Sequence, residues 1–288
     1  MMKTHTGRMR LAPIALISLA AAWGLAFIIM KDSIERQSVN SFLFTRFAVA
    51  VLFLIAFKPT FFRAITKDLF LKAFAAGLLL GAGYILQTEG LARTGAAITG
   101  FITGLYVVST PLISAVILKK KISRFTWGCV ALATVGLALL SLRGWSMGFG
   151  EFLVLLCAIA FGAHIVALGQ WSSGRDVYAM TTVQLFAVTV LTGIFAFAEG
   201  YEVPPDRNVW AVVIFTAIAC TALGFIVQTW AQAHIESTKV AVILTLEIVF
   251  AALFAITIGR ESMTIQVALG GIILLIAMYL IVVKEPTP

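Results

Sequence analysis

The chain has 288 residues, of which 61% are hydrophobic and 12% are charged, and its formal net charge is +8. A soluble globular protein is about half apolar and about a quarter charged, so this composition excludes a soluble core as the place for the apolar surface. It predicts an all-α integral membrane protein, because apolar runs of roughly 20 residues match the thickness of the hydrocarbon layer. Runs such as residues 272–276 (IILLI) lack the apolar and polar alternation of a membrane barrel.

Ten apolar stretches follow one another along the chain with mostly short connections. We expect membrane spans at 11–30, 39–57, 69–90, 96–118, 125–142, 149–171, 177–198, 209–231, 240–258 and 263–283. Of the 21 basic residues, 14 fall in the loops on the side that holds both termini. Basic loops favour the cytoplasm, so this bias predicts cytoplasmic termini and argues against nucleic acid as the partner.

The sequence lacks recognisable catalytic and metal-binding motifs. The three cysteines, Cys129, Cys157 and Cys220, fall inside apolar runs, without metal-ligand spacing or a disulfide framework. No zinc-protease, phosphate-loop or nucleophile-elbow motif appears. We therefore expect no metal, no cofactor, no catalytic residue and no enzyme activity, so any transport would be driven by gradients or exchange.

A short stretch occurs twice. Residues 83–88 (GYILQT) recur at 224–229 as GFIVQT, and Trp23-Gly24 aligns with Phe161-Gly162. The copies of the six-residue stretch are 141 residues apart, whereas Trp23 and Phe161 are 138 apart. We attribute the difference of three residues to a longer loop before the span at 209–231. The matches predict two repeats, 1–142 and 143–288, each with five spans. Five is odd, so the repeats would cross the membrane in opposite senses, as in many secondary transporters.

The predicted spans contain glycines at four-residue spacing and one interrupting proline. Gly77 and Gly81, and likewise Gly100 and Gly104, are four residues apart, which is typical of close helix packing in membranes. Pro111 interrupts the span at 96–118, where it removes a backbone hydrogen bond and permits a kink. The kink would serve a gate or would simply curve the helix.

Two ionisable residues lie deep within spans. A charge at that depth normally faces a partner or water, so Arg46 and Glu247 are both functional candidates. Arg46 would attract an anionic group, or it would form a structural ion pair or reach toward the membrane surface. Glu247 would be a proton-linked carboxylate in coupling, or a hydrogen-bonded structural acid.

Several amphipathic rings fall inside spans rather than at the membrane interfaces, where aromatic residues gather. Such rings suit a cavity for a flat, partly apolar solute, with glutamine side chains giving hydrogen bonds. For any single ring, ordinary packing is the alternative, and His164 lacks a second ligand at metal spacing. The candidate substrate-binding residues are Trp23, Arg46, Tyr84, Gln87, Tyr106, His164, Gln184, Gln228 and Trp230.

Short motifs recur in a fixed order along the chain. They are Trp23-Gly24, Arg46, residues 91–97 (LARTGAA) and 110–112 (TPL), then Ala233, 237–240 (STKV), Leu246-Glu247 and 259–262 (GRES). This order resembles the EamA family of the drug/metabolite transporter (DMT) superfamily, over nearly the whole chain. Within it the chain is most similar to bacterial exporters of the YddG type, which implies export of amino acids, particularly aromatic ones. Family members commonly carry proline where this chain has Ile248, so no kink mirroring Pro111 is implied for 240–258.

Repeat and resemblance together imply a multi-pass secondary active transporter of the bacterial inner membrane. It would export amino acids or related metabolites by alternating access, through a central cavity between the first four spans of each repeat. Its partners would be that small-molecule substrate and the lipid bilayer. An exporter of cationic or hydrophobic drugs, with Glu247 against the cation, is the main alternative, and an intramembrane enzyme and a passive channel are others.

Overall fold

The computed structural model describes residues 2–91, 93, 96–141, 148–258 and 264–284, and all regular structure among them is helical. The boundary expected at 142/143, positions 92, 94 and 95 of the LARTGAA motif and the GRES motif at 259–262 lie outside the described residues. The elements in chain order are α1 (Met2–Glu35), α2 (Val39–Phe57), the 3-10 helix η1 (Pro59–Ala64), α3 (Lys67–Leu91), α4 (Ala96–Gly104), α5 (Tyr106–Val116), α6 (Arg124–Ser141), α7 (Phe149–Trp171), α8 (Val177–Glu199), α9 (Arg207–Phe215), the π-helix η2 (Thr216–Leu223), α10 (Gly224–Gln232), α11 (Ser237–Leu244), α12 (Leu246–Thr257) and α13 (Ile265–Lys284).

Within the described residues, seven helical stretches are long and apolar enough to cross a membrane. They are Leu11–Met30, Val39–Phe57, Lys67–Leu91, Phe149–Trp171, Val177–Glu199, Arg207–Gln232 and Ser237–Phe254. Three shorter apolar helices, Ile102–Val116, Arg124–Leu139 and Ala268–Ile281, overlap the three remaining stretches that the sequence marks as apolar. Large apolar side chains such as Phe57 and Val116 are exposed on the outside, as expected of helices that face lipid.

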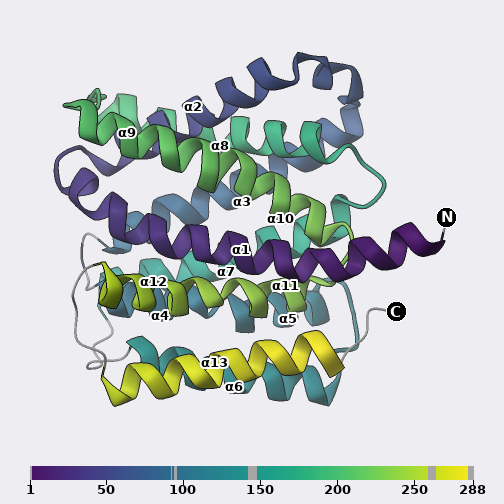
Figure 1. The fold of residues 1–288 in the computed structure, drawn as a ribbon. Coiled ribbons are helices and arrows are strands. Elements are labelled where there is room, and N and C mark those ends of the chain that lie inside the picture. The colour runs from purple at the N-terminus through teal and green to yellow at the C-terminus, as the bar shows by residue number, and fades with distance from the viewer. Residues whose placement is uncertain (1, 92, 94–95, 142–147, 259–263, 285–288) are drawn as a thin grey trace.

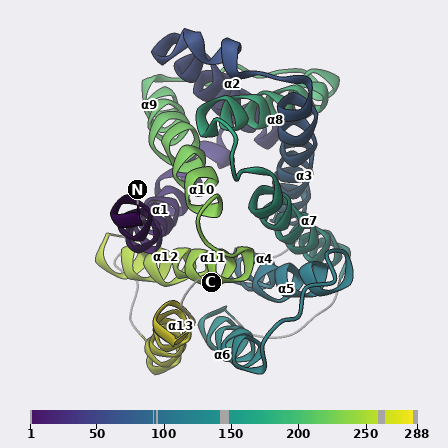
Figure 2. The same ribbon diagram turned by 90° about the vertical axis from the view of Figure 1, so that its right-hand side faces the viewer.

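The long helices lie side by side, and the start of α1 and the end of α13 lie on the same side of the molecule (Figure 1). Helices from the two halves of the chain interleave: α1 packs on α12, α2 on α8, and α3 on both α7 and α8. Figure 2 looks along the bundle and shows α6 and α13 packed together at one edge. The centre is surrounded by α1, α3, α7, α10 and α11 (Figure 2).

Two stretches expected as single spans are interrupted near their middle. The chain departs from α-helix at Leu105, between α4 and α5, and at Thr245, between α11 and α12. The same tightened bonding occurs at both places: Leu105 N–H donates to Ile102 O at 3.1 Å, and Ile248 N–H donates to Thr245 O at 3.2 Å. Thr245 Oγ1 also donates to Val242 O at 2.6 Å, and such back-bonding bends helices without a proline.

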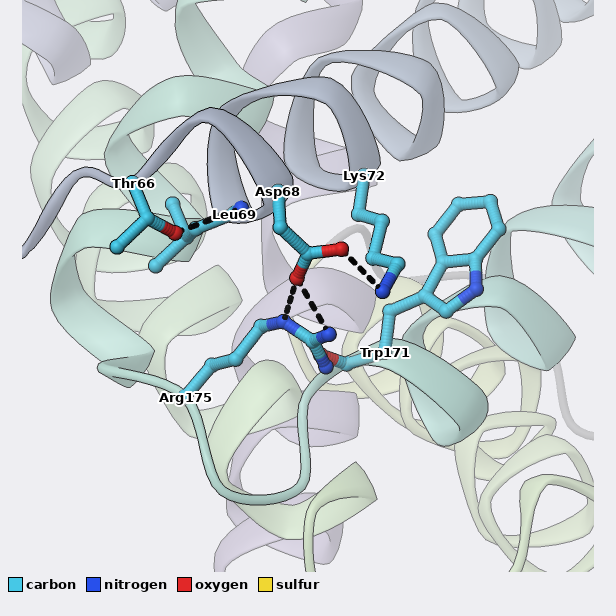
Figure 3. Close-up of polar contacts among 6 residues, drawn as sticks. All are labelled: Thr66, Asp68, Leu69, Lys72, Trp171 and Arg175. Atoms are coloured by element: carbon cyan, nitrogen blue, oxygen red, sulfur yellow. Dashed lines mark hydrogen bonds and ion pairs between the residues drawn. The ribbon is translucent and has the colours of Figure 1, made fainter.

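Charged side chains fasten α3 to the turn between α7 and α8. Asp68 accepts hydrogen bonds from Arg175 Nε at 3.0 Å and from Arg175 Nη2 at 2.6 Å, and its other oxygen pairs with Lys72 Nζ at 2.5 Å (Figure 3). Arg175 Nη1 donates to Trp171 O at 2.7 Å, so the guanidinium closes the end of α7 as well. The three charges form one network, which orients exposed partners better than an isolated pair does.

At the opposite end of the helices, polar groups join the start of α2 to the end of α8 and to the segment that follows it. Asn40 donates to both carboxylate oxygens of Glu199, at 2.9 and 3.0 Å. Ser38 N–H donates to Glu202 Oε2 at 2.7 Å, and Glu202 N–H donates to Ser41 Oγ at 3.0 Å. At the other end of this pair, where α2 ends and α8 begins, Lys58 pairs with Asp176 at 3.7 Å. Polar contacts therefore hold α2 and α8 together at both ends.

Glycines set how closely the helices approach. A Cβ atom added at Gly77 would lie 2.2 Å from Gln184 O, so α3 and α8 touch backbone to backbone there. A Cβ added at Gly100 would meet nothing within 4 Å. Of these two expected packing glycines, only Gly77 has the close neighbour that its spacing suggests.

We expect Gly77→Ala to destabilise the folded protein by about 1–3 kcal/mol, because overpacking forces the backbones of α3 and α8 apart. Gly100→Ala is the matched control and should leave the melting temperature unchanged or slightly raised. The measurement is a thermal melt of the purified protein followed by size-exclusion chromatography. Equal melting temperatures for Gly77→Ala and wild type would contradict the close approach.

Candidate functional site

A cavity lies between helices of the first and second halves. The space among its lining atoms is about 700 Å³, including the part that opens to the surroundings. Its lining comes from α1, α2, α3, α5, α7, α10, α11 and α12, and α8 contributes nothing to it. The lining residues are Trp23, Ala26, Met30, Arg46, Leu80, Tyr84, Gln87, Tyr106, Phe161, His164, Ile165, Phe225, Gln228, Leu244 and Glu247.

Aromatic rings make up much of the wall. The ring of Tyr84 meets that of Phe161 edge-on at 5.4 Å and that of Phe47 at 5.1 Å. The Trp23 ring lies 5.6 Å from that of Phe225, and Trp23 Nε1–H donates to Cys220 O at 2.8 Å. These contacts fix the rings, so the wall is a preformed apolar surface.

Arg46 provides a positive charge in the same cavity. Its side chain is 3% exposed, and its Nε donates to Thr221 Oγ1 of η2 at 2.7 Å. Nη1 contacts the sulfur of Met30 at 3.3 Å, and the guanidinium lies about 6 Å from the ring centroids of Phe47 and Tyr84. None of these neighbours carries a negative charge, so the guanidinium keeps its attraction for an anion.

Glu247, at the start of α12, provides an acidic group. It is 9% exposed and lines the cavity. Within the described part of the chain its carboxylate has no hydrogen-bond partner and no ion pair within 4.0 Å, with Arg46 or any other residue. The cavity thus contains a basic and an acidic side chain that do not pair with each other.

Glutamine side chains add neutral polar groups. Gln87 Nε2 donates to Thr103 Oγ1 at 3.2 Å, which orients its amide at the cavity wall. Gln228 is 2% exposed, and its Oε1 has no partner among the described residues. The hydroxyl of Tyr106 is also buried without a partner there. Buried polar atoms of this kind are rare in proteins and often mark functional positions.

Two of the candidate residues lie outside the lining. Gln184, on α8, is fully buried behind the wall, where it accepts from His164 Nε2 at 3.0 Å and donates to Thr229 Oγ1 at 2.9 Å. Its amide thereby joins His164 on α7 to Thr229 on α10. The ring of Trp230 lies 5.2 Å from that of His234 instead, tilted by 46°. It follows Gln228 by two residues, about 200° around the helix, so the two side chains cannot face the same cavity.

Sequence reasoning missed several residues that build the cavity. Phe161 and Phe225 occupy the positions that the internal alignment pairs with Trp23 and Tyr84, so the alignment was a signal for both. Thr221 and Cys220 belong to the π-helix, and no sequence signal marked them. No described group of His, Cys, Asp and Glu side chains is arranged to hold a metal ion. The arrangement suits reversible binding of a partly apolar, charged solute.

Comparison with known proteins gives the family. The sequence model of the EamA-like transporter family matches twice, at residues 10–142 and 148–283. An "Uncharacterized transporter" of Archaeoglobus fulgidus is 32% identical over 271 residues, which cover 94% of this chain and 85% of that protein. The "Uncharacterized transporter YoaV" of Bacillus subtilis is 25% identical over 275 residues, covering 91% of this chain and 93% of that protein.

A solved structure described as "Crystal structure of protein" superposes with a TM-score of 0.81 and covers 95% of this chain and 99% of its own. At 13% sequence identity, this similarity supports the fold alone. The apolar helices and the transporter relatives agree with a multi-pass membrane protein. The chain belongs to the EamA-like transporter family.

Proposed function

We propose that this protein is a secondary active transporter of the bacterial inner membrane that exports amino acids, especially aromatic or apolar ones, by alternating access. The observation that carries the proposal is an aromatic-walled cavity with a buried guanidinium in it. An apolar side chain would lie against Tyr84, Phe161 and Trp23, and a substrate carboxylate would bind Arg46. Gln87 and Gln228 would contact the remaining polar groups, with both termini in the cytoplasm.

We further propose ten membrane spans in two inverted repeats, 1–142 and 143–288. Matching glycines support this. A Cβ at Gly24 would lie 2.7 Å from Glu247 O on α12, and a Cβ at Gly162 would lie 2.1 Å from Ser109 Oγ on α5. Thus α1 approaches the broken α11–α12 pair as α7 approaches the broken α4–α5 pair.

The repeated motif gives a second pair. A Cβ at Gly83 would lie 2.3 Å from the ring of Phe161, and a Cβ at Gly224 would lie 3.4 Å from Nε1 of Trp23. Each of these glycines therefore lies against an aromatic residue of the other repeat. These two aromatic residues, Phe161 and Trp23, are themselves paired by the internal alignment. A two-fold axis between antiparallel repeats would produce such reciprocal contacts.

Export of cationic or hydrophobic drugs is the second candidate, and the unpaired carboxylate of Glu247 favours it. A hydrophobic cation would satisfy that carboxylate and lie against the rings. The same cation would meet the guanidinium of Arg46 in the same cavity, which weighs against this candidate.

Labelling of single cysteines tests the inverted arrangement. In a background with the three native cysteines replaced, Thr60→Cys and Val203→Cys each place a thiol at an exposed position after the second span of one repeat. We expect a membrane-impermeant maleimide to reach Val203→Cys from the periplasmic side and Thr60→Cys only in inverted vesicles. Both thiols reacting from one side would show parallel insertion.

Transport by proteoliposomes tests the substrate class. Wild-type protein should exchange labelled phenylalanine or tryptophan across the bilayer with saturable kinetics, because the rings and Arg46 provide the matching contacts. Competition by unlabelled apolar amino acids should exceed competition by hydrophobic cations. No movement of any amino acid in a broad panel would remove the proposed substrate class, and the reverse order of competition would favour the drug exporter.

Substitution at the wall tests the site. Tyr84→Ala and Gln87→Ala should each lower phenylalanine uptake at least tenfold at unchanged expression, because one removes a ring of the wall and the other an oriented amide. Tyr279→Ala and Gln170→Ala change the same residue types at exposed positions outside the cavity and should keep wild-type rates. Wild-type uptake by both cavity variants would exclude this part of α3 from the substrate path.

A further inference from the structure

We infer that Glu247, together with the side-chain carbonyl of Gln228, binds the α-ammonium group of the substrate, while Arg46 binds its carboxylate. The inference rests on the proposed function and narrows its substrate class to zwitterions. It makes Glu247 a residue of substrate recognition, whereas its depth in the membrane alone suggested a role in coupling.

The charges of the cavity carry the first step. Arg46 on α2 and Glu247 on α12 both line it, both are at least nine-tenths buried, and they form no ion pair with each other within 4.0 Å. Burying a single uncompensated charge is strongly unfavourable. A solute with one positive and one negative group can satisfy both side chains at once. A solute with one charge leaves the other side chain uncompensated and is repelled by it.

The second step is the orientation of the Gln228 amide. The carbonyl of Ile165 can only accept, so the Gln232 side chain must present its nitrogen there, at 2.5 Å. Gln232 Oε1 then accepts from Gln228 Nε2 at 3.1 Å. This chain fixes the Gln228 amide with its oxygen left over, and that oxygen has no partner among the described residues.

The leftover groups are complementary to an ammonium. A carboxylate and an amide oxygen are both acceptors, and an ammonium offers only donors. Tyr106, whose hydroxyl also lacks a described partner, lies in the same lining and can accept a third hydrogen bond. The acceptor groups of the lining thus come from α5, α10 and α12, whereas the guanidinium comes from α2.

Three probes separate the two charges of the substrate. L-phenylalanine has both, 3-phenylpropionate lacks the ammonium, and phenethylamine lacks the carboxylate. Binding to the purified full-length protein in lipid nanodiscs is measured by calorimetry for each probe. We expect phenylalanine to bind wild type at least tenfold more tightly than either analogue, about 1.4 kcal/mol.

Replacing Glu247 and replacing Arg46 should have opposite effects on the relative affinities of the two single-charge probes. Glu247→Gln should weaken phenylalanine and phenethylamine at least tenfold and leave 3-phenylpropionate unchanged or tighter, because the repulsion of its carboxylate is gone. Arg46→Gln should weaken phenylalanine and 3-phenylpropionate and spare phenethylamine. Glu236→Gln, which removes an exposed carboxylate outside the cavity, is the matched control and should keep the wild-type order.

Equal weakening of all three probes by Glu247→Gln, or unchanged phenylalanine affinity, would overturn the inference. If that variant does not purify as a monodisperse protein, Gln228→Leu decides: selective loss of the two amines supports the site, and equal loss overturns it. A wild type that transports phenylalanine but shows no preference among the probes refutes this inference alone. A wild type that neither binds nor moves any amino acid refutes the proposed function, and this inference with it.

Discussion

Arg46 is held in the cavity wall by neutral neighbours, and the binding that we propose depends on this arrangement. Its guanidinium is fixed by a hydroxyl, a thioether and the faces of two rings, at Thr221, Met30, Phe47 and Tyr84. These partners orient the charge without neutralising it. A carboxylate in the place of Thr221 would hold the guanidinium more firmly and would compete with any anionic solute. The weak, neutral shell therefore keeps the charge available for a solute.

The wall in front of this charge depends on groups behind it. Gln184 is fully buried, and its amide joins His164 on α7 to Thr229 on α10. Thr181 Oγ1 adds a hydrogen bond to Thr229 Oγ1 at 3.1 Å. These side chains find their partners within the protein, so the layer behind the wall is polar but satisfied. Of the five buried polar atoms without a partner among the described residues, two, Gln228 Oε1 and Tyr106 OH, belong to residues of the lining.

Composition and hydropathy predicted the helical membrane class and the positions of the apolar stretches, because both depend only on local residue types. Eight of the ten candidate residues line the cavity, since deep polar and amphipathic side chains in lipid require a protected site. The two exceptions follow from helical phase and layering: Trp230 lies on the far side of α10 from Gln228, and Gln184 belongs to a helix behind the wall. Thr221 could not be predicted, because the drift between the repeated motifs does not reveal the π-helix that presents it.

The π-helix also explains part of the drift between the two copies of the motif. Gln87 follows the first residue of α3 by 20 positions, whereas Gln228 follows the first residue of α9 by 21. One of the three extra residues thus lies inside the helix, where a π-turn accommodates an insertion. In an ordinary α-helix, one extra residue would rotate everything beyond it by about 100°. The wider π-turn absorbs that rotation, so Phe225 and Gln228 line the cavity as Tyr84 and Gln87 do from the uninterrupted helix α3.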